Sequence, residues 1–136
     1  MGKAFGSNRP VINNFPRTVK KILPLMLAMY LHSCNAQPCS QLRQSFESYS
    51  QAISLIQKSS FSIKESANTS GSSWISSAKY YSCDGATGYL IVKTEKGGEY
   101  IHKGVSIEVW NEFKNAASKG SFYNSHTKHK FRLTLN

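Results

Sequence analysis

Residues 74–132, WISSAKYYSCDGATGYLIVKTEKGGEYIHKGVSIEVWNEFKNAASKGSFYNSHTKHKFR, decide the fold, because aromatic residues and turn signals are densest there. Runs rich in β-branched and aromatic residues predict three strands, at residues 74–81, 89–94 and 99–103. The segments CDGATG (83–88) and KGG (96–98) separate these runs, and their glycines can adopt the positive φ angles of tight turns. The pattern therefore predicts a small three-stranded antiparallel sheet.

An amphipathic helix is expected directly after the third strand. Gly104-Val105 should end that strand, and the Ser106 hydroxyl can cap the helix by accepting from a free backbone amide. Lys119 and Gly120 suit the last turn, with the cation at the negative helix end and the glycine in a left-handed cap. This arrangement gives an α+β fold that ends in a short helical and basic tail. The buried stripe of the helix would contain Val109, Trp110, Phe113, Ala116 and Ala117.

A second, separate helix is predicted upstream, within residues 34–57. Its apolar residues fall three and four positions apart, at Cys39, Leu42, Phe46, Tyr49, Ile53 and Ile56. We expect this stripe to pack on the C-terminal module or on a second copy of the chain. Residues 58–73 are rich in serine and predict a flexible surface linker, with a short strand conceivable around Phe61 and Ile63.

The first 33 residues have the pattern of an export signal peptide. Five of the 17 Lys and Arg residues precede residue 22 with no acid among them, and an unbroken apolar run, ILPLMLAMYL, follows at residues 22–31. Such a run lies within the roughly 7–15 residues of a signal-peptide core and below the roughly 20 that cross a bilayer as a helix. A buried core helix is the alternative, but Pro24 and the all-basic leader favour export.

Two cleavage sites compete at the end of this leader. Residues 31–34 (LHSC) resemble a bacterial lipobox, in which the cysteine, here Cys34, becomes the lipidated N terminus and the membrane anchor. His32 departs from the small or aliphatic residue that is usual there. A cut after Ala36 would instead release a soluble periplasmic or secreted protein. Removal of residues 1–33 leaves 12 basic and 7 acidic residues, so the net charge falls from +10 to +5.

The chain has three cysteines, and their use depends on the compartment. If Cys34 carries lipid, Cys39 and Cys83 remain as one possible disulfide under oxidising conditions. In the cytosol all three would be thiols. The sequence alone does not distinguish these alternatives.

Several segments resemble the KTSC domain, in the order that this family shows. They are WISSA (74–78), GGEY (97–100), GV (104–105) leading to VW (109–110), and SKGSFYN (118–124). The resemblance predicts a domain at residues 74–133. The central Tyr-x-Tyr of the family appears here as Tyr100-Ile101-His102, and Ser106 replaces the usual proline that opens the helix.

The family is named after a C-terminal segment of some lysyl-tRNA synthetases, and it also occurs in small stand-alone bacterial and phage proteins. RNA binding has been proposed for it without being established, so the resemblance implies that activity only as a hypothesis. The chain itself offers a candidate binding patch, because cations can neutralise phosphates and exposed rings can stack on unpaired bases of RNA or single-stranded DNA. Packing of these rings on the sheet is the alternative. The patch consists of Lys119, Phe122, Tyr123, His126, Lys128, Lys130 and Arg132.

Three classes of function follow. The favoured one is a non-enzymatic exported protein, lipid-anchored at Cys34 or soluble, that presents the module to an unknown ligand or protein partner. The second is a nucleic-acid-binding module in the cytoplasm. An enzyme is disfavoured, because the sequence shows no paired acids, nucleophile–base pair or phosphate loop. An active site would require the fold to bring Cys83, His102 and His126 together. No metal or cofactor is expected, since the histidines lack a recognisable ligand set.

Overall fold

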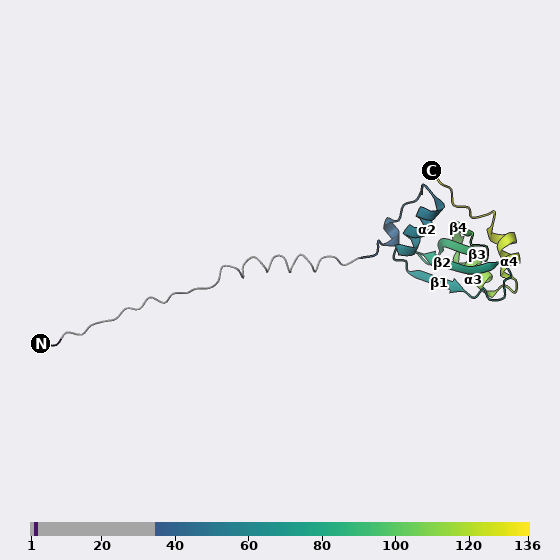
Figure 1. The fold of residues 1–136 in the computed structure, drawn as a ribbon, viewed down its shortest axis with the longest axis horizontal. Coiled ribbons are helices and arrows are strands. Elements are labelled where there is room, and N and C mark those ends of the chain that lie inside the picture. The colour runs from purple at the N-terminus through teal and green to yellow at the C-terminus, as the bar shows by residue number, and fades with distance from the viewer. Residues whose placement is uncertain (1, 3–34) are drawn as a thin grey trace. The chain divides into compact units, whose positions relative to one another are not determined.

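A four-stranded antiparallel sheet in the order β1-β2-β3-β4 forms the centre of the fold (Figure 1). This computed structural model describes residue 2 and residues 35–136, so Cys34 and the predicted signal peptide, apart from residue 2, lie outside the described residues. The strands are β1 (Ile63–Ala67), β2 (Ile75–Ser82), β3 (Thr87–Thr94) and β4 (Glu99–Ser106). The helices are η3 (Cys39–Gln41), α2 (Tyr49–Lys58), α3 (Ile107–Asn115), α4 (Lys119–Phe122) and the π-helix η4 (Tyr123–Thr127). The α+β class is confirmed, whereas the predicted number of three strands is wrong.

The additional strand, β1, lies inside the segment predicted to be a flexible linker. It pairs antiparallel with β2 along its whole length. The Glu65 carboxylate of β1 also accepts from the Trp110 indole at 2.7 Å and from the Lys114 ammonium at 2.6 Å, so the strand is tied to α3. These partners lie far away in the sequence, and β-strand formation depends on such context more than on local composition. The linker prediction is therefore wrong for residues 63–67, although β1 begins at Ile63, where the sequence also allowed a short strand.

β4 is longer than predicted, because Gly104 continues the strand as a β-bulge. Tyr89 faces Lys103 across the β3–β4 ladder, whereas Gly88 faces Val105, which leaves Gly104 as the extra residue. Its φ of +77° lies in the left-handed region that glycine adopts without a steric penalty. The strand continues beyond the bulge, and the prediction that it ends at Gly104-Val105 is wrong.

α3 begins as predicted and ends earlier than predicted. The Val109 amide donates to the Ser106 hydroxyl at 3.3 Å, which confirms the N-cap. After α3, Ser118 caps a new short helix, α4. Gly120 is buried inside α4 against the Trp74 indole, where a Cβ atom would overlap the ring. Close packing therefore requires this glycine, and the predicted left-handed helix cap is wrong.

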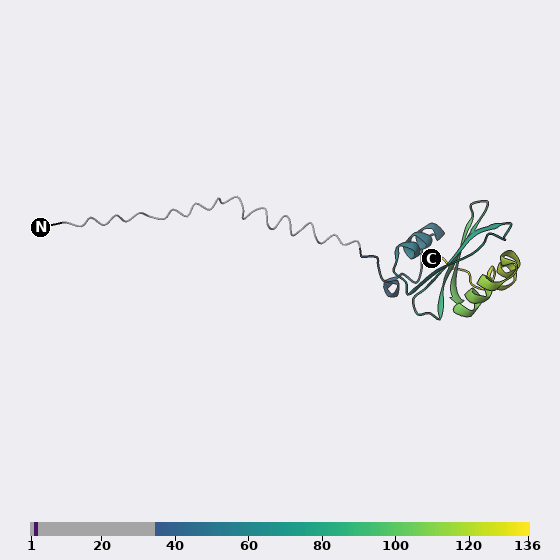
Figure 2. The same cartoon turned by 90° about the horizontal axis from the view of Figure 1, so that it is seen from below.

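One face of the sheet is covered by α3, α4 and η4 (Figure 2). Trp110 is fully buried there, with its ring stacked on Tyr80 at a centroid distance of 5.3 Å and on Phe113 at 5.8 Å. The predicted stripe is thus confirmed at Trp110 and Phe113, whereas Ala116 and Ala117 follow the end of the helix. We call this group the α3-side cluster; it contains Ile75, Ala78, Tyr80, Leu90, Val92, Val105, Trp110, Phe113 and Tyr123.

The opposite face is covered by residues 39–58, which we call the N-terminal extension (Figure 2). The helix predicted within residues 34–57 is interrupted, because the Ser48 hydroxyl accepts from the Gln51 amide at 3.1 Å and starts α2 there. Leu42 and Phe46 lie before α2 in irregular chain and are buried. The extension is therefore part of the core and not a separate helix. The α2-side cluster contains Leu42, Phe46, Ala52, Ile53, Ile56, Tyr81, Tyr89, Ile91, Ile101 and Leu133.

A disulfide fixes the start of the extension to the domain. Cys39 and Cys83 are bonded across a sequence separation of 44 residues, with their Cα atoms 5.8 Å apart. Cys83 follows β2 directly, so the bond joins the extension to the β2–β3 turn. The sequence left open whether these cysteines form a disulfide or remain thiols, and the structure contains the disulfide.

Candidate functional site at the edge of β4

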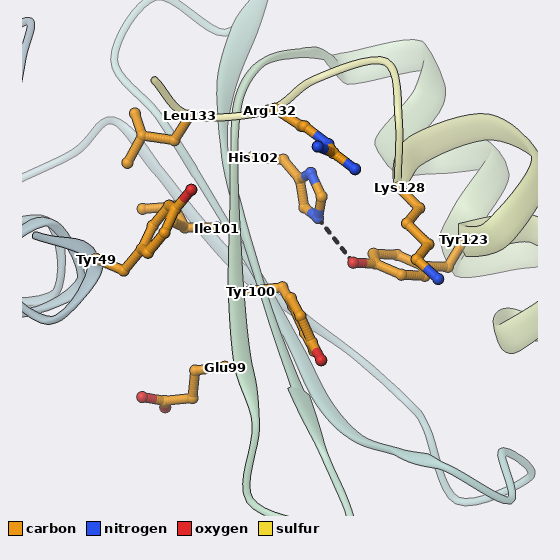
Figure 3. Close-up of a pocket in the computed structure, with 9 residues that line it drawn as sticks. All are labelled: Tyr49, Glu99, Tyr100, Ile101, His102, Tyr123, Lys128, Arg132 and Leu133. Carbon is orange, nitrogen blue, oxygen red and sulfur yellow. Dashed lines mark hydrogen bonds between the residues drawn. The ribbon is translucent and has the colours of Figure 1, made fainter. Parts of the chain in front are cut away.

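The candidate site is a pocket of about 310 Å³ at the outer edge of β4 (Figure 3). β4 is an edge strand, so one of its long edges faces away from the sheet. An isolated bridge between His102 and Arg132 and a hydrogen bond of 2.9 Å from the Lys103 amide to the Phe131 carbonyl connect this edge to the C-terminal segment. The pocket is lined by Tyr49, Glu99, Tyr100, Ile101, His102, Tyr123, Lys128, Arg132 and Leu133.

The pocket has two different walls, because successive side chains of a strand point to opposite faces. Figure 3 shows Tyr49, Ile101 and Leu133 on one side of β4, where they form an apolar wall beside α2. Tyr100 lies on the other side of the strand, together with Tyr123 (Figure 3). Tyr49 and Tyr100 are 50% and 49% exposed and are the large hydrophobic residues that stay exposed within the described part of the chain. They are therefore available to a ligand.

His102 and Tyr123 form the buried part of the aromatic wall. His102 Nε2 and Tyr123 Oη share a hydrogen bond of 3.0 Å, and the two residues are only 4% and 2% exposed. Burial lowers the pKa of His102 to about 4, and it raises the pKa of Tyr123 to about 12. Both side chains are consequently neutral at pH 7. The pair shapes the wall without adding charge to it.

Charge in the pocket comes from Lys128, Arg132 and Glu99. Burial has the larger effect on the pKa of both His102 and Tyr123. The positive charge of Arg132 makes a smaller contribution that lowers both pKa values, so its field reaches this wall. The Lys128 side chain extends over the same wall, whereas Glu99 points to the opposite side of β4 (Figure 3). The aromatic wall therefore carries positive charge and suits an anionic group.

The structure brings together three of the seven residues of the predicted patch, namely Tyr123, Lys128 and Arg132. The other members lie elsewhere. Lys119 donates to a backbone carbonyl of residue 116 at 2.7 Å, and Phe122 stacks on His126 with ring centroids 4.4 Å apart. Lys130 is exposed and is not among the lining residues. The predicted patch is therefore divided into a pocket wall and a separate solvent-facing part.

Several lining residues were not part of that patch. Tyr49 was predicted to lie in a buried helical stripe, but it stands half-exposed at the start of α2. Tyr100 carried a signal, because it occupies the first tyrosine position of the family's Tyr-x-Tyr. Nothing in the sequence places Tyr49 beside β4, since that proximity requires the extension to pack on the sheet.

The residues considered for an enzyme are not assembled. Cys83 is bonded to Cys39, His102 is paired with Tyr123, and His126 is stacked on Phe122. Among the residues that the structure describes, no three His, Cys, Asp or Glu side chains are grouped so as to hold a metal ion. In the same part of the chain, no helix has both the length and the apolar character that crossing a bilayer requires.

The sheet, its two covered faces and the edge pocket define a small α+β module. Residues 71–131 match the family model of the KTSC domain. For this segment, the match confirms the resemblance to the KTSC domain seen in the sequence. The matched segment contains β2, β3, β4 and α3, whereas β1 and the N-terminal extension precede it. No curated protein and no solved structure matches the chain.

Proposed function

We propose that this protein is exported and presents its KTSC domain as a non-enzymatic interaction module in the cell envelope. The observation that carries the proposal is the Cys39–Cys83 disulfide. Disulfides persist in oxidising compartments and are rare in the cytosol, where thiols are kept reduced. The bond joins two segments that are distant in the sequence and contributes to the core arrangement, so it is a structural feature of the fold.

The leader supports the same proposal independently. Its basic residues, its apolar run at residues 22–31 and its two cleavage signals are typical of a signal peptide. Lipidation at Cys34 would anchor the protein in a membrane, whereas cleavage after Ala36 would release it. Both products keep Cys39 and therefore the disulfide.

An anchored form would hold the domain close to the bilayer. Only residues 35–38 separate Cys34 from Cys39, which is fixed to the β2–β3 turn. A fully extended chain from Cys34 to Cys39 spans at most about 18 Å. The serine-rich segment expected to act as a spacer contains β1 instead. The proposed anchor thus places the module at the membrane surface without a long tether.

Intact-mass measurement of the protein from fractionated cells tests this proposal. Alkylation of free thiols before and after reduction should reveal two additional reactive cysteines only after reduction. A product that begins at Cys34 and carries acyl chains supports the anchored form, and one that begins at Gln37 supports the soluble form. A full-length cytosolic product with three alkylatable thiols would contradict export.

Replacement of the anchor residue provides the matched control. Cys34→Ser should move the protein from the membrane fraction to the soluble or secreted fraction while the Cys39–Cys83 bond stays intact. Retention of the variant in the membrane would exclude lipidation at Cys34 as the anchor and would indicate an uncleaved leader, which the mass of the variant would show.

A second candidate function is nucleic-acid binding, and one observation favours it. The exposed Tyr100 ring lies on the same wall as Lys128 and Arg132, an arrangement that suits base stacking next to a phosphate. Retardation of short RNA or single-stranded DNA by the full chain, with a steep loss of affinity as salt rises, would support it. Tyr100→Ala should weaken such binding, whereas Lys79→Gln, on the β1 side of the sheet, should not. Absence of retardation at low salt would eliminate this candidate.

A further inference from the structure

We propose that the outer edge of β4 binds an extended acidic peptide as a fifth strand of the sheet. This inference deepens the proposed interaction role by naming the kind of ligand that the module takes. It rests on the backbone of β4, on the two walls of the pocket and on the charge of one wall. Each of these observations restricts the ligand in a different way.

The backbone of β4 offers unpaired groups along the pocket. The Lys103 amide points away from β3 and donates to the Phe131 carbonyl at 2.9 Å. Residues two apart in a strand direct their amides and carbonyls to the same edge, so Ile101 and Glu99 also point outward. The C-terminal segment reaches the bridge between His102 and Arg132, which sets Leu133 opposite Ile101, and no described strand lies next to Glu99 and Tyr100. An extended chain can pair there.

The pocket surrounds this edge and therefore fits a strand. Its lining residues lie on both faces of β4, with Ile101, Tyr49 and Leu133 on one side and Tyr100 and Tyr123 on the other (Figure 3). The side chains of an added strand would likewise alternate between the two faces. One set would meet the apolar wall, and the next set would meet the aromatic wall. A compact ligand would use only one of these walls.

The charge of the aromatic wall selects the sequence of the peptide. Lys128 and Arg132 lie on that side, while His102 is neutral at pH 7 because burial lowers its pKa to about 4. Glu99, the acid that lines the pocket, points to the other side (Figure 3). A carboxylate should therefore face Lys128 and Arg132, and an apolar side chain should face Ile101. The expected ligand alternates acidic and apolar residues.

Binding of the capped peptide Val-Glu-Val-Glu-Val to the full chain, purified in mild detergent, tests the inference. At about 1 mM peptide, where weak contacts become visible, NMR spectra should show shifts of the Glu99 and Ile101 amides. The charge-reversed peptide Val-Lys-Val-Lys-Val should give at least about threefold weaker binding. Lys128→Gln and Arg132→Gln should each weaken binding of the acidic peptide by about threefold to tenfold.

Backbone pairing is tested separately from charge. In an extended peptide the amides of the valines and those of the glutamates point to opposite edges, so N-methylation of one set should abolish binding and N-methylation of the other should not. Glu99→Pro removes an outward amide at the first position of β4, where proline is tolerated, and Glu99→Ala is its matched control. The proline variant should bind more weakly than the alanine variant.

The inference is overturned if the peptide causes no amide shifts on β4. It is also overturned if binding survives when each set of amides is methylated in turn. Displacement of the peptide by single-stranded oligonucleotide at equal concentration would overturn it as well. A dimer in sedimentation, with the same amide shifts as the peptide complex, would indicate self-association through β4. In that case the ligand of the edge would be a second copy of the chain, and the inference would be overturned. The test is independent of export, because it measures binding alone. A failure here leaves the localisation experiment unaffected.

Discussion

The two faces of the sheet differ in the origin of what covers them. The α3-side cluster is built from residues within the family match, and its helices follow β4 directly. The α2-side cluster combines the sheet with the N-terminal extension, which precedes the match and is held by the Cys39–Cys83 bond. The family segment by itself would expose Tyr81, Tyr89 and Ile91. An added segment and a covalent bond therefore complete this module.

The largest expected effect concerns the α3 side. Trp110→Ala should destabilise the protein by about 5 kcal/mol, because it leaves a large cavity between Tyr80 and Phe113 and removes the donor to Glu65. Urea denaturation followed by tryptophan fluorescence and circular dichroism measures the change. Ile56→Ala, in the α2-side cluster, is the matched control on the other face and should cost about 2–4 kcal/mol. Equal losses would show that the two faces contribute alike.

The second effect concerns the bond that holds the extension. Replacing both Cys39 and Cys83 by Ala should lower the free energy of unfolding by about 4 kcal/mol, since the closed loop of about 44 residues restricts the unfolded chain. Hydrogen exchange should accelerate most strongly in α2, whereas α3 should keep more of its protection. Uniform acceleration over both helices would contradict a separable extension.

Acid should weaken the α3 side through His102. Its pKa of about 4 in the fold lies below the ordinary value of 6.5, so the unfolded state binds more protons between these values and stability falls as the pH decreases from 6.5 towards 4. The loss is up to about 3 kcal/mol. Urea midpoints at pH 7 and pH 4.5 measure it.

The acid effect needs a variant that cannot titrate. His102→Gln should remove most of the pH dependence above pH 4.5. Hydrogen bonds lower the pKa of Glu65, mainly through Lys114, and the pKa of Asp84, mainly through the Thr87 amide. These carboxylates lose their stabilising charge only as the pH falls below their ordinary pKa values of 4.5 and 3.8. A persistent slope in the variant between pH 7 and pH 4.5 would assign the effect to other groups.

The smallest effect tests the close packing of α4. Gly120→Ala should destabilise the protein by about 1–3 kcal/mol, because the new methyl group overlaps the Trp74 indole. Gly71→Ala is the matched control, since a Cβ atom there would meet nothing within 4 Å. Thermal denaturation of both variants measures the difference. A harmless Gly120→Ala substitution would show that Trp74 can move away.

Local patterns predicted the local parts of the fold. The β2–β3–β4 succession, the Ser106 cap and the burial of Trp110 followed from alternation, turn glycines and helical spacing. Predictions failed where a distant contact overrides the local signal. β1 forms in a serine-rich segment because β2 and α3 offer partners, and Gly120 looks like a helix terminator but lies beneath Trp74.

The candidate site was predictable only in part for the same reason. Tyr123, Lys128 and Arg132 belong to one continuous stretch, so their composition indicated a binding surface. Tyr49 and Ile101 join them only through the packing of α2 and the position of β4 at the sheet edge. A pocket with unlike walls cannot be read from spacing along one segment.

The sequence by itself determined the KTSC segment, the α+β class and the pattern of an export leader, because each of these depends on the order and spacing of neighbouring residues. Tertiary structure alone decided the fourth strand, the pairing of Cys39 with Cys83 and the union of Tyr49 with Arg132 in one pocket. Those features require segments dozens of residues apart to meet. The free energy that holds them together comes from burial and covalent closure, which local propensity does not contain.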